Sequence, residues 1–203
     1  MQSITNLGQG DAGTKLAALT FDDGPHWSNT PKLLDVVSKT TIKLTFFVLG
    51  QHAKQHPDIL RRQASEGHEI GNHSWSHPDL TMLGPAEVQD EIQRTDEIIT
   101  QHAGIKSLLF RPPYGRTTDA LRQLLRYNFG YATILWTVDS LDWRIRDATA
   151  IADRILRNIR SGSIVLLHDI HVVSIEAILA VSESLLSTGY ELVTVSELLQ
   201  RTV

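Results

Sequence analysis

The sequence predicts an α/β fold in which one parallel sheet is covered by helices. The first observation is that apolar, strand-like runs alternate with amphipathic helical segments from residue 16 to residue 200, without an intervening linker. The second is that polar clusters follow several of these runs, at the sheet edge where barrel enzymes carry their chemistry. About seven parallel strands are expected, and either an α/β barrel or an open sheet would fit this pattern.

The length and charge favour a single soluble domain. A chain of 203 residues can bury a sizeable core, and we expect one domain over residues 16–203 after an N-terminal extension of residues 1–15. The 19 basic and 23 acidic residues give a formal charge of −4 without a basic run, so nucleic acid is not an expected partner. Because cysteine is absent, disulfides, thiolate ligands and a cysteine nucleophile are excluded.

No stretch approaches the ~18 consecutive apolar residues of a membrane span, and residues 1–13 lack the features of a signal peptide. A chain from which an export signal had been removed would look the same. We expect a monomer.

In the first half of the chain, strands are predicted at residues 16–21, 43–49 and 68–71. Helices are predicted at 30–39, where Pro31 suits the first turn, and at 53–67. The third strand leads into a loop at 72–80. The helix at 85–101 carries apolar or small residues at helical spacing: Val88, Ile92, Thr95 and Ile99.

In the second half, strands are predicted at residues 108–110, 131–138, 164–167 and 191–194. The helices that alternate with them cover 116–127, 148–160, 175–187 and 195–200. The helix at 148–160 is the clearest of these, because isoleucine recurs every four residues at 151, 155 and 159.

Two adjacent carboxylates, Asp22 and Asp23, end the first strand and precede the breaker Gly24-Pro25. Neighbouring side chains of a strand point to opposite faces, so both can serve one site only if the strand ends here. Two ionised carboxylates repel each other, which is tolerable where one of them binds a cation. The pair therefore indicates one metal ligand and one base, with a surface turn as the alternative.

His73 and His77 are four residues apart and could face the same way on a single helical turn. Together with a carboxylate from Asp22 or Asp23, they give two neutral imidazoles and one anion. This set suits zinc, or cobalt or another first-row divalent metal, with coordination positions left open. An open position is typical of a catalytic site rather than a structural one.

A stiff segment, residues 111–115, follows the fourth predicted strand. Its two prolines fix their own φ angles and restrict the residues before them. The stiffness could place the Tyr114 amide against an oxyanion and Arg111 against a carboxylate. A plain Pro-Pro turn with a solvated arginine is the alternative.

Strand alternation puts Leu166 and His168 on one face, where His168 could be a general acid, a metal ligand or a core residue. Residues 139–143 offer a carboxylate that could orient this histidine, and Trp143 could form an aromatic wall. The other histidines are expected at surface or loop positions: His26, His52, His56, His68, His102 and His171. His171 is the next candidate for an acid.

In chain order, five segments resemble the motifs of the polysaccharide deacetylases, the NodB-like group that is also called the fourth carbohydrate esterase family. They are residues 20–25, 73–77, 111–115, 139–143 and 166–169. The resemblance spans residues 16–199 and implies a distorted (β/α) barrel of seven strands. It also implies metal-dependent hydrolysis of acetyl groups on a sugar polymer.

Position by position, the resemblance implies that Asp23, His73 and His77 hold the metal, with zinc as the first expectation. Asp22 would be the base, held by Arg111, and His168 the acid, tuned by Asp142. The backbone amide of Tyr114 would bind the oxyanion, and Trp143 and Leu166 would shape the acetyl pocket.

The resemblance is strongest to peptidoglycan N-acetylglucosamine deacetylases, so we expect N-acetyl removal from peptidoglycan or a chitin-like polymer by an exported protein. Esterase activity on O-acetylated xylan or exopolysaccharide is the alternative. A two-histidine, one-carboxylate iron oxygenase would need neither the second carboxylate nor a distant acid histidine. An inactive sugar-binding relative would be expected to lack the base or the acid, and both are present.

Overall fold

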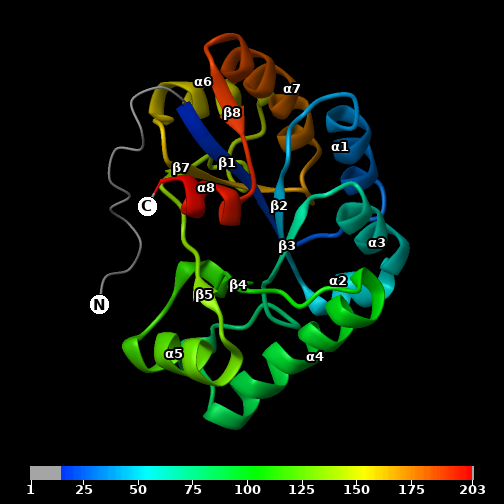
Figure 1. Cartoon of the computed structure of the whole chain (residues 1–203), viewed down its shortest axis with the longest axis vertical. Helices are drawn as coiled ribbons and strands as arrows, with labels where there is room; N and C mark the ends of the chain where they lie inside the picture. The colour runs from blue at the N-terminus through cyan, green and yellow to red at the C-terminus, as the bar shows by residue number, and fades with distance from the viewer. Residues whose placement is uncertain (1–14, 203) are drawn as a thin grey trace.

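The computed structural model describes residues 15–202 and contains one curled parallel sheet (Figure 1). Its strands are β1 (Lys15–Asp22), β2 (Thr45–Val48), β3 (Glu69–Asn72), β4 (Leu109–Phe110), β5 (Ala132–Thr133), β6 (Val138–Asp139), β7 (Ser163–His168) and β8 (Tyr190–Leu192). Seven of them follow the order β5-β4-β3-β2-β1-β7-β6, and β8 pairs with the first residues of β1. Within the described residues the end strands β5 and β6 do not pair with each other. The predicted distorted barrel is confirmed, in an open form.

Helices surround the sheet in Figure 1. They are α1 (Asn29–Val37), α2 (Gly50–Gln55), α3 (Pro57–Ser65), α4 (Pro85–Ala103), α5 (Asp119–Leu124), α6 (Ala148–Asn158), α7 (Val172–Ser187) and α8 (Val195–Arg201). Three short helical turns lie at Leu80–Met82, Pro113–Gly115 and Leu125–Phe129. Among residues 15–202, no helix has the length and apolar character needed to cross a membrane. Of the expected N-terminal extension, residues 1–14 lie outside the described part, and Lys15 already belongs to β1.

Alternation along β1 separates the core from the site. One set of its side chains packs against α1, α6 and α7 on the outer face of the sheet: Ala17, Leu19 and Phe21. The other set faces the barrel interior, where Leu16 and Ala18 pack with residues of α8. Asp22 belongs to this interior set and Asp23 follows the last residue of the strand, so the two carboxylates reach the same site from different backbone positions.

Two predicted elements are divided in the structure. The helix predicted at 53–67 is two helices, α2 and α3, because Pro57 has no N–H to donate and restricts His56, whose ψ is 54°. The strand predicted at 131–138 is only β5 and β6. Between these two strands the chain moves from β4 to β7. The N–H of Ile134 donates to the carbonyl oxygen of Phe110 in β4, and the N–H of Thr137 donates to that of Ile164 in β7.

The remaining helix boundaries differ by a few residues. The helix predicted at 116–127 begins at Asp119, because the Thr118 hydroxyl caps the N–H of Leu121. The helix predicted at 175–187 begins earlier, at Val172. The helix predicted at 85–101 continues to Ala103 and ends at Gly104, which has a left-handed φ of 69°.

The central position of β1 gives a stability prediction. Leu19 is fully buried in the outer core, so Leu19→Ala is expected to lower the free energy of unfolding by about 2–5 kcal/mol. Leu179 on α7 is 46% exposed, and Leu179→Ala should change the free energy of unfolding by less than about 0.5 kcal/mol. Urea unfolding measures both variants, and equal losses would contradict the placement of the core.

Candidate active site

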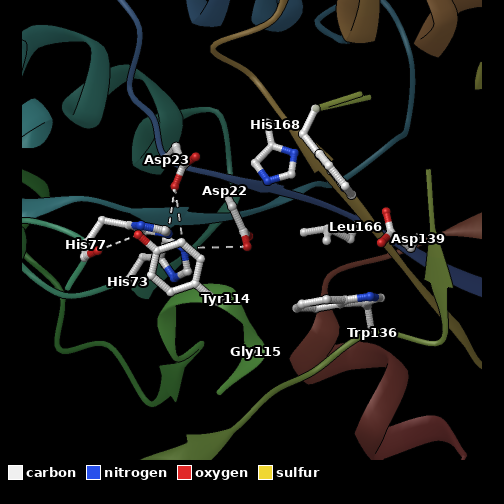
Figure 2. Close-up of a pocket in the computed structure, with 11 residues that line it drawn as sticks. Asp22, Asp23, His73, His77, Tyr114, Gly115, Trp136, Asp139, Leu166 and His168 are labelled. Carbon is white, nitrogen blue, oxygen red and sulfur yellow. Dashed lines mark hydrogen bonds and ion pairs between the residues drawn. The ribbon is translucent and has the colours of Figure 1, made fainter. Parts of the chain in front are cut away.

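A cavity of about 460 Å³ opens where the sheet strands end (Figure 2). Residues at or after the ends of β1, β3, β4, β5, β6 and β7 line it: Asp22, Asp23, His73, His77, Tyr114, Gly115, Trp136, Asp139, Trp143, Leu166 and His168. Eight of the ten residues that the sequence singles out are therefore in the wall. The other two, Arg111 and Asp142, are buried behind it.

Arg111 is fully buried and holds Asp22 from behind. Its guanidinium donates hydrogen bonds to Asp22 Oδ1 (2.7 Å) and to the Thr20 hydroxyl (2.7 Å). It also lies 4.0 Å from the centre of the Phe47 ring. One carboxylate oxygen of Asp22 is thus fixed by Arg111, and Oδ2 remains on the cavity side, 3.7 Å from His73 Nε2.

Asp23, His73 and His77 form a three-residue cluster beside Asp22. Asp23 Oδ1 lies 3.5 Å from Nε2 of each histidine, and candidate ligand atoms of all three residues lie within 4.8 Å of one another. This oxygen is buried, yet it has no hydrogen-bond partner in the described structure. A buried carboxylate oxygen is rarely left unpaired, so the cluster fits a divalent cation held by two imidazoles and one carboxylate.

The protonation of this cluster also suits a cation. His73 Nδ1 donates to the Arg111 carbonyl oxygen (2.7 Å), which leaves Nε2 unprotonated in the neutral ring and directed at Asp23. Burial alone would raise the pKa of Asp23, but the nearby histidines, above all His73, outweigh it and hold this pKa well below its usual value. Burial and the neighbouring His73 lower the pKa of His77, which favours its neutral form.

His73 and His77 do not share a helical turn, contrary to the expectation from their spacing. They lie in a loop in which Ser74 and His77 adopt left-handed φ angles of 72° and 62°. Five non-glycine residues in the described chain have such angles, and all lie in the segments that follow β1, β3, β4 and β6: Asp23, Ser74, His77, Tyr114 and Leu141.

His168 lies across the cavity from His77 (Figure 2) and is held by Asp142. Its Nδ1 donates to Asp142 Oδ1 (2.8 Å), and its backbone N–H donates to Oδ2 (2.7 Å). The Ser174 hydroxyl also donates to Oδ2 (2.5 Å), so the buried carboxylate has a partner on each oxygen. Burial opposes protonation of His168, but Asp142, with Asp22 and Asp23, raises its pKa to about 9.

The predicted substrate-binding residues line the cavity in different ways. The Tyr114 ring lies edge-on to His77, with centroids 4.5 Å apart, and the residue has a left-handed φ of 59°. Leu166 is buried at the cavity floor, whereas Trp143 is half exposed at its rim.

Four residues at or near the site have no role predicted from the sequence, although two of them, Asp139 and Asp169, lie in segments that it singles out. Trp136 and Asp139 line the cavity, although Trp136 lies in a segment read only as a strand. His52, expected at the surface, donates from Nδ1 to the Asp23 carbonyl (2.6 Å). Asp169 is fully buried beside Gly24 and accepts a hydrogen bond from Thr30, and burial raises its pKa to about 7.

His68, also expected in a surface or loop position, is a buried structural residue. Its Nδ1 accepts the N–H of Leu44 (3.2 Å), and burial lowers its pKa to about 4. The sequence places His68 at the start of a predicted strand, and a strand position could have indicated burial.

The chain is similar in sequence and in fold to known proteins. The family described as "Polysaccharide deacetylase" matches residues 9–134. The chain is 42% identical over 188 residues to peptidoglycan-N-acetylmuramic acid deacetylase PdaC of Bacillus subtilis, covering 93% of this chain and 39% of that protein. It is 40% identical over 184 residues to peptidoglycan-N-acetylglucosamine deacetylase PgdA of Listeria monocytogenes, covering 91% and 39%.

A solved structure of peptidoglycan deacetylase PdaC from Bacillus subtilis superposes with a TM-score of 0.88 at 41% identity, covering 94% of this chain and 92% of that one. The chain spans 39% of the length of the curated relatives named above. The match of the family over residues 9–134, the strand order and the identity to these relatives lead to one conclusion: this chain belongs to the polysaccharide deacetylase family.

Proposed function

We propose that the chain is a metal-dependent hydrolase that removes N-acetyl groups from N-acetylglucosamine units of peptidoglycan or a chitin-like polymer and releases acetate. One observation carries the proposal: Nε2 of His73 and Nε2 of His77 both face the unpaired Oδ1 of Asp23. The cavity that holds this cluster also has Asp22 and His168 in its wall. Residues 16–203 are proposed to form one catalytic domain.

Asp23, His73 and His77 would hold the metal ion, with zinc as the first choice and cobalt or another first-row metal as alternatives. When bound, such an ion would lower the pKa of its bound water and polarise the acetyl carbonyl. The chain's own residues then have to move protons and stabilise charge around the substrate.

Asp22 is proposed to accept the proton of the attacking water. Arg111 fixes its Oδ1, so Oδ2 presents its lone pairs to the cavity without rotating away. The backbone N–H of Tyr114 is proposed to donate to the oxyanion that forms on the acetyl oxygen. Loss of one such donor costs about 3 kcal/mol in related oxyanion holes.

His168 is proposed to protonate the departing amine from Nε2, while its Nδ1–H stays with Asp142. An amide nitrogen is a poor leaving group until it receives a proton. The raised pKa of His168, about 9, keeps the imidazolium form available at neutral pH. Asp142 also fixes the ring's orientation, as its contacts with Nδ1 and the backbone N–H of His168 limit rotation.

The choice of substrate rests on the cavity wall and on the relatives. Leu166 and Trp136 give one side of the cavity an apolar surface that suits an acetyl methyl group. The relatives are named for deacetylation of amino sugars in peptidoglycan, which supports an N-acetyl substrate and an exported or envelope location. O-acetylated xylan is the second candidate substrate. We expect the protein to act as a monomer.

The activity is tested by acetate release from chito-oligosaccharides, peptidoglycan and acetylated xylan, before and after chelation. We expect faster release from the N-acetylglucosamine polymers, loss on chelation and recovery with zinc or cobalt. Acetate release without oxygen would exclude an oxygenase. Undiminished turnover of the stripped protein would contradict the metal assignment, and faster release from xylan would reverse the substrate choice.

Asp22 and Asp23 should fail in different ways, because one is proposed to move a proton and the other to bind metal. Asp22→Asn is expected to retain most of the zinc while kcat falls at least about 100-fold. Asp23→Ala should lose both zinc and turnover. Elemental analysis together with kcat separates the roles, and equal loss of zinc in both variants would mean that they are shared or reversed.

The pH dependence of kcat/KM should be bell-shaped, with His168 setting the alkaline limb. This ring faces Asp142, Asp22 and Asp23, with the His171 ring at 5.9 Å and the Asp169 carboxyl nearby. Activity that needs the imidazolium is lost as pH rises through its pKa, and removing a carboxylate lowers that pKa.

Asp142→Asn should therefore move the alkaline limb at least about one pH unit lower and leave the acid limb nearly unmoved. Asp153→Asn, which removes an exposed carboxylate on α6, is the matched control and should move neither limb. An alkaline limb that stays in place in Asp142→Asn would contradict the acid assignment, and His171 would be tested next.

A further inference from the structure

The loop formed by residues 72–77, here called the histidine loop, is bound by a carboxylate that the proposed reaction does not use. Glu91 lies on α4, and its Oε2 accepts the backbone N–H groups of Trp75 (2.9 Å) and Ser76 (2.8 Å). Its Oε1 accepts the Ser76 hydroxyl (2.8 Å). Hydrogen bonds to a charged acceptor are stronger than neutral ones, and here three of them meet at one side chain.

Helix α2 holds the same loop from another side, and α2 and α4 are neighbours in Figure 1. The N–H groups of Gly50 and Gln51 donate to the carbonyl oxygens of Ser74 (3.0 Å) and Trp75 (3.1 Å). A Cβ on Gly50 would lie 2.4 Å from the Trp75 ring, so the contact leaves no room for a larger residue. The backbone of Trp75 is thus held at both ends: its N–H donates to Glu91 of α4, and its carbonyl oxygen accepts the N–H of Gln51 of α2.

The backbone of the histidine loop needs this external support. Ser74 and His77 both adopt left-handed φ angles, each at a cost of order 1 kcal/mol for a residue with a side chain. Within the loop, the Ser74 hydroxyl accepts the N–H of His77 (3.1 Å), and the Asn72 amide oxygen accepts the N–H of Ser74 (2.8 Å). The second of these bonds fixes Ser74, and the first encloses Trp75 and Ser76, which are the residues that Glu91 holds.

We propose that Glu91 is a positioning residue for the metal site, which keeps the histidine loop in the shape that directs His77 Nε2 at Asp23 before any ion binds. The inference rests on the proposed function, because it takes His77 as a ligand. Without Glu91, the loop would have to become ordered when the ion binds, and the cost of ordering would appear as weaker metal affinity.

The test is the zinc dissociation constant of the purified protein, measured by competition with a chromophoric chelator. Glu91→Ala is expected to weaken zinc binding about tenfold or more, the usual loss for a residue that supports a ligand. Glu91→Gln should lose much less, because its amide oxygen can accept both N–H groups and its amide N–H can donate to the Ser76 hydroxyl. Glu97→Ala removes an exposed carboxylate of the same helix and should leave the affinity unchanged.

Amide hydrogen exchange in the zinc-free protein gives a second readout, and its wild-type result alone can contradict the inference. The Trp75 and Ser76 amides should be protected in the wild type and in Glu91→Gln, and should exchange faster in Glu91→Ala. Unprotected amides in the zinc-free wild type would overturn the inference even if Glu91→Ala did not fold.

The outcomes separate the two proposals. Equal zinc affinity in Glu91→Ala and wild type would overturn the role of Glu91 and leave the proposed function standing. A wild-type protein that binds no zinc, cobalt or other first-row divalent ion would overturn both.

Discussion

A guanidinium with no exposure to solvent stands at the centre of this molecule. Arg111 follows β4, whereas its partners Thr20 and Asp22 belong to β1, and β3 and β2 lie between these strands in the sheet. Its side chain therefore crosses the barrel interior. A buried charge without a partner costs several kcal/mol, so the guanidinium of Arg111 needs the carboxylate of Asp22. The curl of the sheet brings the ends of β4 and β1 close enough for this contact. The backbone carbonyl of Arg111 also accepts His73 Nδ1, which ties the proposed base and a proposed ligand to one residue.

Histidines in the same cavity are prepared for opposite tasks by the partners of their rings. His73 Nδ1 is bonded to a neutral carbonyl, and burial together with His73 lowers the pKa of His77, as suits rings that present an unprotonated nitrogen to a cation. His168 Nδ1 is bonded to the carboxylate of Asp142, which raises the pKa of His168. The pKa of His77 and the pKa of His168 are thus shifted in opposite directions on opposite walls of one cavity. Burial and a neighbouring imidazole act on His77, whereas a carboxylate acts on His168, so the difference comes from the surroundings of each ring.

Local signals in the sequence were sufficient for the sheet and for most of the cavity wall. The apolar runs of the strands and the polar residues at the ends of β1, β3, β4 and β7 are short-range patterns, and these placed Asp22, His73, Arg111 and His168 at one edge. Features that depend on contacts distant in sequence were missed. The path of residues 134–137 from β4 to β7 brings Trp136 to the cavity, and the loop around His77 departs from a helical turn because α2 and α4 bind it.

The residues with left-handed φ angles around the cavity limit which substitutions the chain can accept. Asp23, Ser74 and His77 each hold a backbone conformation that glycine would adopt with less strain, yet glycine would remove a side chain that lies in the site or its loop. At these positions, a substitution that relieves backbone strain therefore also removes a side chain that the proposed site uses. A search for thermostable variants would gain most on the outer helices, because substitutions around the cavity would also affect the proposed activity.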